Sequence, residues 1–253
     1  MMRRICIFLA LVLLAPSCKA GTPKRYTVEV VKEYRHDTGA YTQGLFFHDG
    51  KLYESTGQYG ESTIRIVDLE TGEVTKKLNF ARKYFAEGSV ILGDNLYVLT
   101  WTNKVAFIYD AATLEYKQTY SYPREGWGLT TDGKNLIASD GSSRLFFLTP
   151  DLKLLKSITV KMNGRPVRLL NELEWINGRI WANVYTSNAI LIINPSSGEV
   201  EAMINCGGLL PDKLRGPDTD VLNGIAVDKD GRIYLTGKNW PRLYEVKLVP
   251  VKK

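Results

Sequence analysis

Cysteine and histidine are scarce in this sequence of 253 residues. The three cysteines are Cys6, Cys18 and Cys206, and the two histidines are His36 and His48. Three cysteines cannot form a disulfide framework, and stability must therefore come from a hydrophobic core. No Cys/His/Asp cluster has the spacing of a zinc site, and no nucleophile elbow accompanies either histidine. We therefore expect no metal and no other cofactor.

Two further patterns are missing. No glycine-rich phosphate loop is present, and the basic residues never form a run of five or more. The formal net charge of +6 falls to +4 if the two residues Arg3 and Arg4 leave with an N-terminal signal. This scattered charge does not indicate a nucleic-acid partner. Residues 228–231 faintly resemble a calcium loop, but Asn239 stands where the bidentate glutamate belongs, so we interpret them as a turn.

The N-terminus has the three-part pattern of a secretory signal. Arg3 and Arg4 precede an apolar run over residues 5–15, and small residues follow. The run is too short for a comfortable membrane span. We expect residues 1–20 to be a signal peptide, cleaved near Ser17 or Ala20, and residues 21–253 to form a single domain. A buried N-terminal helix is the alternative.

Ser17-Cys18 also resembles a bacterial lipoprotein cleavage site, although Ala15 and Pro16 depart from the usual residues. On that reading a lipid on Cys18 anchors the protein, and it is the only membrane contact we expect. The predicted location is outside the cytoplasm, in the bacterial periplasm or as an outer-membrane lipoprotein, with secretion as a further alternative.

Five segments share a turn followed by an apolar pair, with spacings of 44, 40, 44 and 53 residues. The pairs are Leu52-Tyr53, Leu96-Tyr97, Leu136-Ile137, Ile180-Trp181 and Ile233-Tyr234. A strand pattern precedes each pair and another follows it, and in the first four copies a turn leads to a fourth strand. Four-stranded units with this period are typical of a β-propeller. The widest spacing places an insertion at residues 206–220, which we interpret as a loop.

The fifth copy ends at Lys253 without a fourth strand. The N-terminal strand pattern of residues 25–34 belongs to no copy, so it can complete the last sheet and cover its edge. The predicted fold class is all-β: a five-bladed β-propeller of four-stranded antiparallel blades, with the last blade closed by the N-terminal strand. A β-sandwich is the alternative, but it does not explain the shared spacing.

The hairpin of residues 171–185 indicates where a site would lie. Its turn dipeptide Asn177-Gly178 suits a type I′ turn, so Asn171 and Tyr185 meet at its open end. In a propeller the first strands line the central channel and start at one mouth, to which the second strands return. That mouth would gather the polar and aromatic residues at the other hairpin ends, which are Gln43, Glu87, Trp101, Trp127 and Lys238, with Asp140 and Glu172 beside them. Glycines next to four of the polar residues would let the backbone bend or approach a ligand.

Six of these groups favour a pocket for a small molecule or a peptide end over a set of channel caps, namely Gln43, Glu87, Trp101, Trp127, Asn171 and Lys238. Glu87 is the candidate general acid/base. The indoles of Trp101 and Trp127 can lower the local dielectric and raise its pKa toward neutrality.

A resemblance to glutaminyl cyclases of the plant and bacterial type is carried by YTQGL, YESTGQYGES, FAEGS, LTW, GWGLTTDG, NELEWINGRIWANV, DVLNGIA and TGKNWP. It extends from about Tyr26 to Val249. The resemblance implies a metal-free five-bladed propeller that converts the N-terminal glutamine of peptides and proteins to pyroglutamate and releases ammonia. It implies Glu87 as the catalytic residue and the following substrate-binding residues: Gln43, Trp101, Trp127, Asn171, Tyr185 and Lys238. Tyr185 departs from the tryptophan that similar proteins often carry.

Two other functions fit the same mouth. One is a non-catalytic propeller that binds a ligand or a partner protein, and the other is a hydrolase in which Glu87 activates water. For the cyclase, the expected partners are peptides or proteins with an N-terminal glutamine, and we expect the enzyme to be a monomer.

Overall fold

The computed structural model describes residues 22–252, which fold almost entirely into β-strands. These residues contain no α-helix, and a single 3-10 turn, η1 (Asp212–Leu214), lies inside the predicted insertion. The all-β prediction is therefore confirmed. No helix in this part of the chain is long and apolar enough to cross a membrane. The predicted signal peptide, including Cys18, lies outside the described residues.

Three of the sheets are antiparallel, contain four strands each, and follow one another along the chain. The first sheet holds β2 (Thr42–His48), β3 (Lys51–Thr56), β4 (Thr63–Val67) and β5 (Val74–Asn79). The second holds β6 (Ala86–Leu92), β7 (Asn95–Thr100), β8 (Val105–Asp110) and β9 (Tyr116–Ser121). The third holds β10 (Leu129–Thr131), β11 (Leu136–Ser139), β12 (Arg144–Leu148) and β13 (Leu154–Thr159). A short hairpin of β14 (Lys161–Met162) and β15 (Arg165–Pro166) follows, which the repeat pattern did not predict.

The remaining strands form one eight-stranded sheet in the order β16-β17-β18-β19-β1-β22-β21-β20. Its members are β16 (Leu170–Ile176), β17 (Arg179–Val184), β18 (Ala189–Ile193), β19 (Val200–Asn205), β1 (Lys24–Arg35), β22 (Arg242–Pro250), β21 (Ile233–Gly237) and β20 (Leu222–Val227). The N-terminal strand β1 pairs antiparallel with β22, as the sequence predicts. Its first residues, Lys24 to Thr27, also pair in parallel with β19. This second pairing was not predicted, and it arises because the 12-residue β1 is longer than the other strands.

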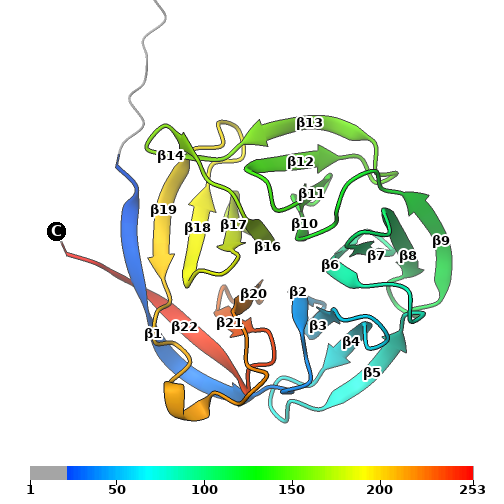
Figure 1. The fold of residues 1–253 in the computed structure, drawn as a ribbon, viewed down its shortest axis with the longest axis horizontal. Coiled ribbons are helices and arrows are strands. Elements are labelled where there is room, and N and C mark those ends of the chain that lie inside the picture. The colour runs from blue at the N-terminus through cyan, green and yellow to red at the C-terminus, as the bar shows by residue number, and fades with distance from the viewer. Residues whose placement is uncertain (1–21, 253) are drawn as a thin grey trace, which may run out of the picture.

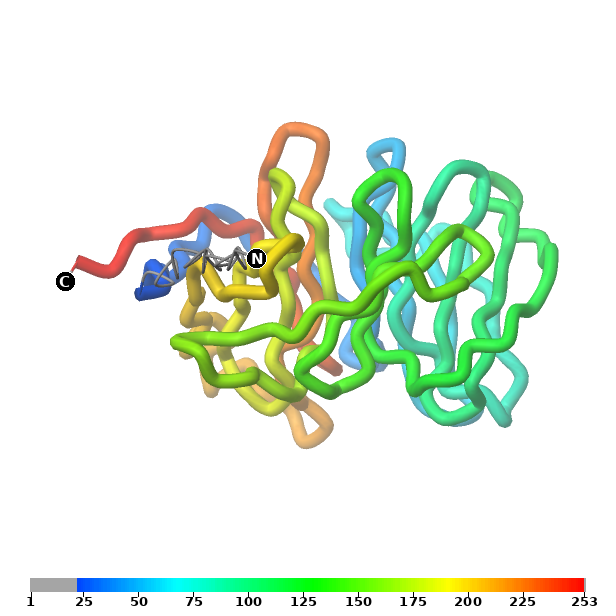
Figure 2. Tube along the Cα trace, turned by 90° about the horizontal axis from the view of Figure 1, so that it is seen from above, coloured from blue at the N-terminus to red at the C-terminus, as the bar shows by residue number. Residues whose placement is uncertain are grey.

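The sheets surround a common centre, as in β-propellers. The first strand of each hairpin pair, β2, β6, β10, β16 or β20, lies nearest that centre, and β5, β9, β13 and β1 lie at the periphery (Figure 1). Seen from the side, several turns between first and second strands project from one face (Figure 2). The turn at Asn177-Gly178 has φ angles of 50° and 74°, the positive values that a type I′ turn requires.

Five apolar clusters fill the spaces between neighbouring groups of strands. Alternation along each strand sends one set of side chains to each side, so each four-stranded sheet contributes to two clusters. Between the first two sheets, Phe46 and Tyr53 stack on the side of Ile91 and Val98. The ring closes where Tyr34 and Leu45 pack with Tyr234. The core is therefore spread around the ring, which leaves the centre for polar groups.

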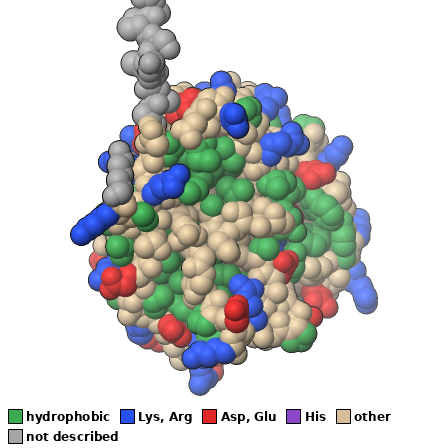
Figure 3. All heavy atoms as spheres, turned by 60° about the vertical axis from the view of Figure 1, so that its left-hand side comes forward, with side chains coloured by type: hydrophobic (Ala, Val, Ile, Leu, Met, Phe, Trp, Pro, Cys, Tyr) green, Lys and Arg blue, Asp and Glu red, His purple; other side chains and the backbone are tan. Residues whose placement is uncertain are grey.

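Charged side chains are dispersed over the surface. On the face drawn in Figure 3, Lys and Arg side chains lie around the rim, interspersed with acidic ones and with apolar areas.

Candidate active site

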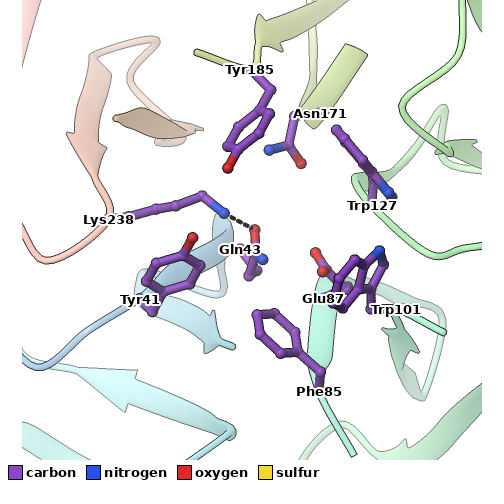
Figure 4. Close-up of a pocket in the computed structure, with 9 residues that line it drawn as sticks. All are labelled: Tyr41, Gln43, Phe85, Glu87, Trp101, Trp127, Asn171, Tyr185 and Lys238. Atoms are coloured by element: carbon purple, nitrogen blue, oxygen red, sulfur yellow. Dashed lines mark hydrogen bonds between the residues drawn. The ribbon is translucent and has the colours of Figure 1, made fainter. Parts of the chain in front are cut away.

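One pocket lies at the end of the centre where the first strands begin. It is lined by Tyr41, Gln43, Phe85, Glu87, Trp101, Trp127, Asn171, Tyr185 and Lys238. These side chains point into a common space from all sides (Figure 4). The structure thus brings together all seven residues that the sequence singled out. The pocket has a volume of about 180 Å³, below the 300–1,000 Å³ of pockets for drug-sized ligands, so it suits one amino-acid residue.

The strand ends explain this convergence. Gln43, Glu87 and Asn171 lie in the first strands β2, β6 and β16, close to where each begins. Trp101, Tyr185 and Lys238 follow the last residues of the second strands β7, β17 and β21. Trp127 comes two residues before β10. Because each hairpin is antiparallel, the starts and ends meet on one face of the ring.

Two lining residues, Tyr41 and Phe85, were missed by the sequence analysis. Each stands two residues before a predicted member, Gln43 or Glu87. Residues i and i+2 of an extended chain point to the same side. An aromatic residue two positions ahead of each polar residue was therefore the signal in YTQ and FAE.

Two of the glycines beside the polar residues lie where the backbones of neighbouring strands come close. A Cβ on Gly88 would lie 2.4 Å from the backbone nitrogen of Leu129, and one on Gly128 would lie 2.0 Å from the carbonyl oxygen of Asn171. Gly88 also donates its N–H to the carbonyl of Trp127 at 2.7 Å. At these positions the glycines let neighbouring first strands approach one another.

Lys238 forms the cationic side of the pocket. It is only 2% exposed, and its Nζ donates to Gln43 Oε1 at 2.6 Å. The ammonium also lies over the rings of Tyr41 and Tyr185, at 4.3 and 5.5 Å from their centroids. Burial lowers the pKa of Lys238 to about 8, although the negative charge of Glu87 opposes this. The site therefore holds a cation whose charge changes within a biochemically accessible pH range.

Glu87 lies opposite and is 5% exposed. Its backbone carbonyl accepts a hydrogen bond from Ser55 Oγ at 2.7 Å, which fixes this part of β6. Within residues 22–252 its side-chain carboxylate takes part in no hydrogen bond or salt bridge. Burial raises the pKa of Glu87 well above its ordinary value, while Lys238 lowers it and Glu125 raises it further. A buried carboxyl group with a raised pKa is a candidate general acid/base.

Aromatic rings form the walls around Glu87. Phe85 and Trp101 make an edge contact with ring centroids 5.6 Å apart, and Trp127 meets Tyr185 in the same way at 5.7 Å. The two indole N–H groups of Trp101 and Trp127 point to one acceptor, Glu125 Oε2. Glu125 was not predicted from the sequence, although it stands two residues before Trp127.

Asn171 offers a free acceptor. It is 3% exposed, and its Oδ1 has no hydrogen-bond partner among residues 22–252. Buried polar atoms are rarely left unpaired, so this oxygen suits an N–H donor of a ligand.

Asp140 and Glu172 were expected at the same mouth, but neither lines the pocket. Asp140 accepts hydrogen bonds from the backbone and hydroxyl of Ser142 in its own turn. The Glu172 carboxylate lies in the centre of the ring, where it accepts the backbone N–H groups of Ile225 and Leu45 at 2.9 and 3.4 Å. They do not belong to the pocket lining, because their carboxylates accept hydrogen bonds from Ser142 and from the backbone of neighbouring strands.

Among residues 22–252, no three His, Cys, Asp or Glu side chains are grouped so as to hold a metal ion.

Comparisons with known proteins agree with this geometry. A sequence model of the family described as glutamine cyclotransferase matches residues 4–248. The chain is 44% identical over 229 residues to a glutaminyl-peptide cyclotransferase of Arabidopsis thaliana, with 87% of this chain and 71% of that protein covered.

Solved structures give the same picture. The crystal structure of Myxococcus xanthus glutaminyl cyclase is similar with a TM-score of 0.85 and 40% identity, covering 91% of this chain and all of that one. The WD40 β-propeller domain of Doa1 has a TM-score of 0.50 and 12% identity, covering 80% and 62% of the two chains, and at that identity it bears on the fold alone. The chain belongs to the glutamine cyclotransferase family.

Proposed function

We infer that the protein is a glutaminyl-peptide cyclotransferase, an acyltransferase that converts the N-terminal glutamine of peptides to pyroglutamate and releases ammonia. One observation supports the assignment of this reaction to the pocket: in a member of this family, Glu87, Asn171 and Lys238 lie together within aromatic walls. The pocket is open to solvent. When the first residue of a peptide is bound in it, the rest of the peptide can extend outward through this opening.

In the proposed reaction, the α-amine nitrogen of the substrate attacks the carbonyl carbon of its own side-chain amide. A five-membered ring closes, the C–N bond to the amide nitrogen breaks, and ammonia leaves. The α-amine has an ordinary pKa of about 7.7–8.0, so a useful neutral fraction exists near neutral pH. The attack is intramolecular, and the protein's main tasks are to hold the folded conformation and to move one proton.

Glu87 performs the proton transfer in this proposal. As a carboxylate it accepts a proton from the attacking amine, and as a carboxylic acid it returns that proton to the departing ammonia. Its lack of a hydrogen-bonding partner within the described part of the chain leaves both oxygens available, and burial raises its pKa well above the ordinary value of a glutamate. No metal takes part, since Glu87 supplies the acid and the base, and we expect activity to survive EDTA and phenanthroline. Inhibition by phenanthroline that added zinc reverses would contradict this.

The remaining side chains bind and orient the substrate. Lys238 Nζ, held by Gln43, can donate a hydrogen bond to the oxyanion that forms on the amide carbon. The unpaired Oδ1 of Asn171 can accept a hydrogen bond from an N–H of the substrate. Trp101 and Trp127 confine the side chain to a conformation near that of the attack.

The experiment is to incubate the purified protein with peptides that begin with glutamine and to follow their mass. Cyclisation removes the mass of one ammonia. Deamidation by water would instead add the small mass difference between an amide and an acid, and a binding module would leave the mass unchanged. The proposal predicts the first result and fails on either of the others.

We also propose that the fold consists of five blades, two of which are joined into the eight-stranded sheet by β1. The five apolar clusters between groups of four strands support this count. A variant that lacks residues 21–30 loses the part of β1 that pairs with residues 246–250 of β22, so we expect it to associate or precipitate.

We propose export through residues 1–20, a single domain over residues 21–253, and a monomeric enzyme. If Cys18 carries a lipid, Cys18→Ala moves the protein from the membrane fraction to the soluble fraction. Persistence of that variant in the membrane fraction would contradict anchoring at Cys18.

A further inference from the structure

Glu125 stands between the two tryptophans of the pocket wall. Its Oε2 accepts the indole N–H of Trp101 at 3.0 Å and that of Trp127 at 3.1 Å. An oxygen bonded to both rings fixes each indole relative to the other. We propose that Glu125 is a positioning residue of the cyclisation reaction, which holds Trp101 and Trp127 as a rigid clamp around the glutamine side chain of the substrate. This inference rests on the proposed function.

The loop that carries Glu125 is itself fastened to the sheet. Gly126 donates its N–H to the carbonyl of Thr100 at 3.0 Å, and a Cβ at Gly126 would lie 2.7 Å from that same oxygen. At the other end, the fully buried Tyr122 donates its N–H to the carbonyl of Lys104 at 2.8 Å. The carboxylate therefore extends from a backbone whose position is set by β7 and by the loop that follows it.

The two indoles depend on Glu125 to different degrees. Trp127 packs closely against Gly141, where an added Cβ would lie 2.6 Å from the ring, and it also meets Tyr185. Trp101 is 36% exposed, and in the described part of the chain its one aromatic contact is with Phe85. Packing thus holds Trp127 even without the carboxylate, whereas Trp101 needs the hydrogen bond to stay in place. The loss of the clamp should therefore act mainly through Trp101.

A fixed wall matters for a reaction that depends on the conformation of the substrate. A free glutamine side chain samples many rotamers, and only a folded one brings the α-amine to the amide carbon. Indoles that are already in place cut the cost of ordering the site when the substrate binds. Hydrogen bonds to a carboxylate are stronger than those between neutral groups, which suits this task in a partly exposed position.

The test compares Glu125→Ala with Glu125→Gln. The amide oxygen of glutamine still accepts both indole N–H groups, whereas alanine cannot. We expect Glu125→Ala to lower kcat/KM about tenfold, mainly by raising KM, because a hydrogen-bonded wall is lost. Glu125→Gln should restore most of that loss, and Tm should stay unchanged in both. Glu115→Ala, which removes an exposed glutamate away from the pocket, is the matched control and should behave as the wild type does.

The same substitution in a Trp101→Phe variant separates the clamp from other effects of the Glu125 charge. Trp101→Phe keeps an aromatic ring but has no N–H to donate. In that background Glu125→Ala should have a much smaller effect than it has alone. An undiminished effect there, or a Glu125→Gln variant as impaired as Glu125→Ala, overturns the clamp.

The clamp also has a readout that needs no activity. Release of Trp101 should make tryptophan fluorescence more accessible to quenching by acrylamide in Glu125→Ala, but not in Glu125→Gln or Glu115→Ala. If the wild type cyclises peptides and both KM and quenching are unchanged in Glu125→Ala, the clamp is wrong and the function stands. If the wild type forms no pyroglutamate, the proposed function fails, and unchanged quenching would then reject the clamp as well.

Discussion

Two glutamates from neighbouring sheets, Glu54 of β3 and Glu87 of β6, are both buried, at 1% and 5% exposure. Glu54 is fully bonded. Its Oε2 accepts Nε and Nη2 of Arg65 at 2.9 and 2.7 Å, and its Oε1 meets His36 Nε2 at 2.9 Å and Thr42 Oγ1 at 2.6 Å. Burial alone would raise the pKa of Glu54, but Arg65 and His36 together hold it well below its ordinary value.

Glu87 has none of these partners in the described residues. Burial dominates and raises the pKa of Glu87. The positive charge of Lys238 lowers this pKa in part, but the Lys238 ammonium donates its hydrogen bond to Gln43. The same side chain in two buried settings is thus locked as an anion in one and left able to exchange a proton in the other. The comparison teaches that burial alone does not mark a candidate acid/base, whereas burial without a hydrogen-bonding partner does.

The largest expected difference is in stability, and it separates the two glutamates directly. Glu54→Gln leaves Arg65 buried with only the partly exposed Asp37 as its acid. Breaking a buried pair typically costs about 3–5 kcal/mol, and we expect a loss of that size in the free energy of unfolding, measured with urea. Glu87→Gln should show no such loss. Equal destabilisation by the two changes would break the comparison.

The next effect concerns the cation beside Glu87. Lys238→Met keeps much of the side-chain volume but removes the charge and the donor to the oxyanion, so we expect kcat to fall by about 10²-fold or more. Because the pKa of Lys238 is about 8, wild-type activity that depends on its positive charge should decline above that pH. Lys238→Met should lack this decline. A decline that is the same in the variant would assign it to another group.

The pH dependence of stability should have opposite signs at the two glutamates. The pKa of Glu54 is lowered on folding, so its contribution is present above its ordinary pKa of 4.5 and is lost as pH falls toward the folded value. The pKa of Glu87 is raised on folding, so its carboxyl group costs least below 4.5 and destabilises the protein as pH rises.

Urea midpoints over a range of pH test this contrast. Glu87→Gln should become more stable than the wild type as pH rises, by roughly 1.4 kcal/mol for each unit of pKa shift. Glu54→Gln should be most destabilising at neutral pH. If the urea midpoints of Glu87→Gln and Glu54→Gln changed with pH in the same way, the predicted contrast between the two glutamates would be contradicted.

The smallest effect is expected at Tyr185. Tyr185→Phe keeps the ring that meets Trp127 and lies near Lys238, and removes only the hydroxyl. A single neutral hydrogen bond is worth about 1 kcal/mol at most sites, so kcat/KM should change by less than about fivefold. Tyr185→Ala should have a larger effect because it also opens the wall. A large loss in Tyr185→Phe would give the hydroxyl a direct role.

Much of this architecture follows from the sequence. The repeat spacing predicts the hairpins, and the type I′ turn at Asn177-Gly178 fixes which residues meet at an open end. The direction of the strands then brings Gln43, Glu87 and Lys238 to one mouth. These inferences succeed because each depends on strand periodicity and turn chemistry, which are local properties.

What the sequence did not predict depends on contacts between distant segments. The parallel pairing of β1 with β19 requires the ring to be closed. Glu125 contacts the indole of Trp101 because its loop lies against β7. Glu172 does not line the pocket, because backbone N–H groups of β2 and β20 donate to its carboxylate. The bonded state of Glu54 likewise depends on Arg65 and His36, which no single motif connects to it.

The central claim, that Glu87 moves the proton, is tested most directly by the turnover of Glu87→Gln on a peptide that begins with glutamine. The amide keeps the shape of the pocket but cannot exchange a proton. We predict that kcat falls by about 10²–10⁴-fold, while a product-like peptide that begins with pyroglutamate binds with nearly unchanged affinity and Tm does not fall. Near-normal turnover in Glu87→Gln, with Asp140→Asn or Glu172→Gln losing activity instead, would contradict the account.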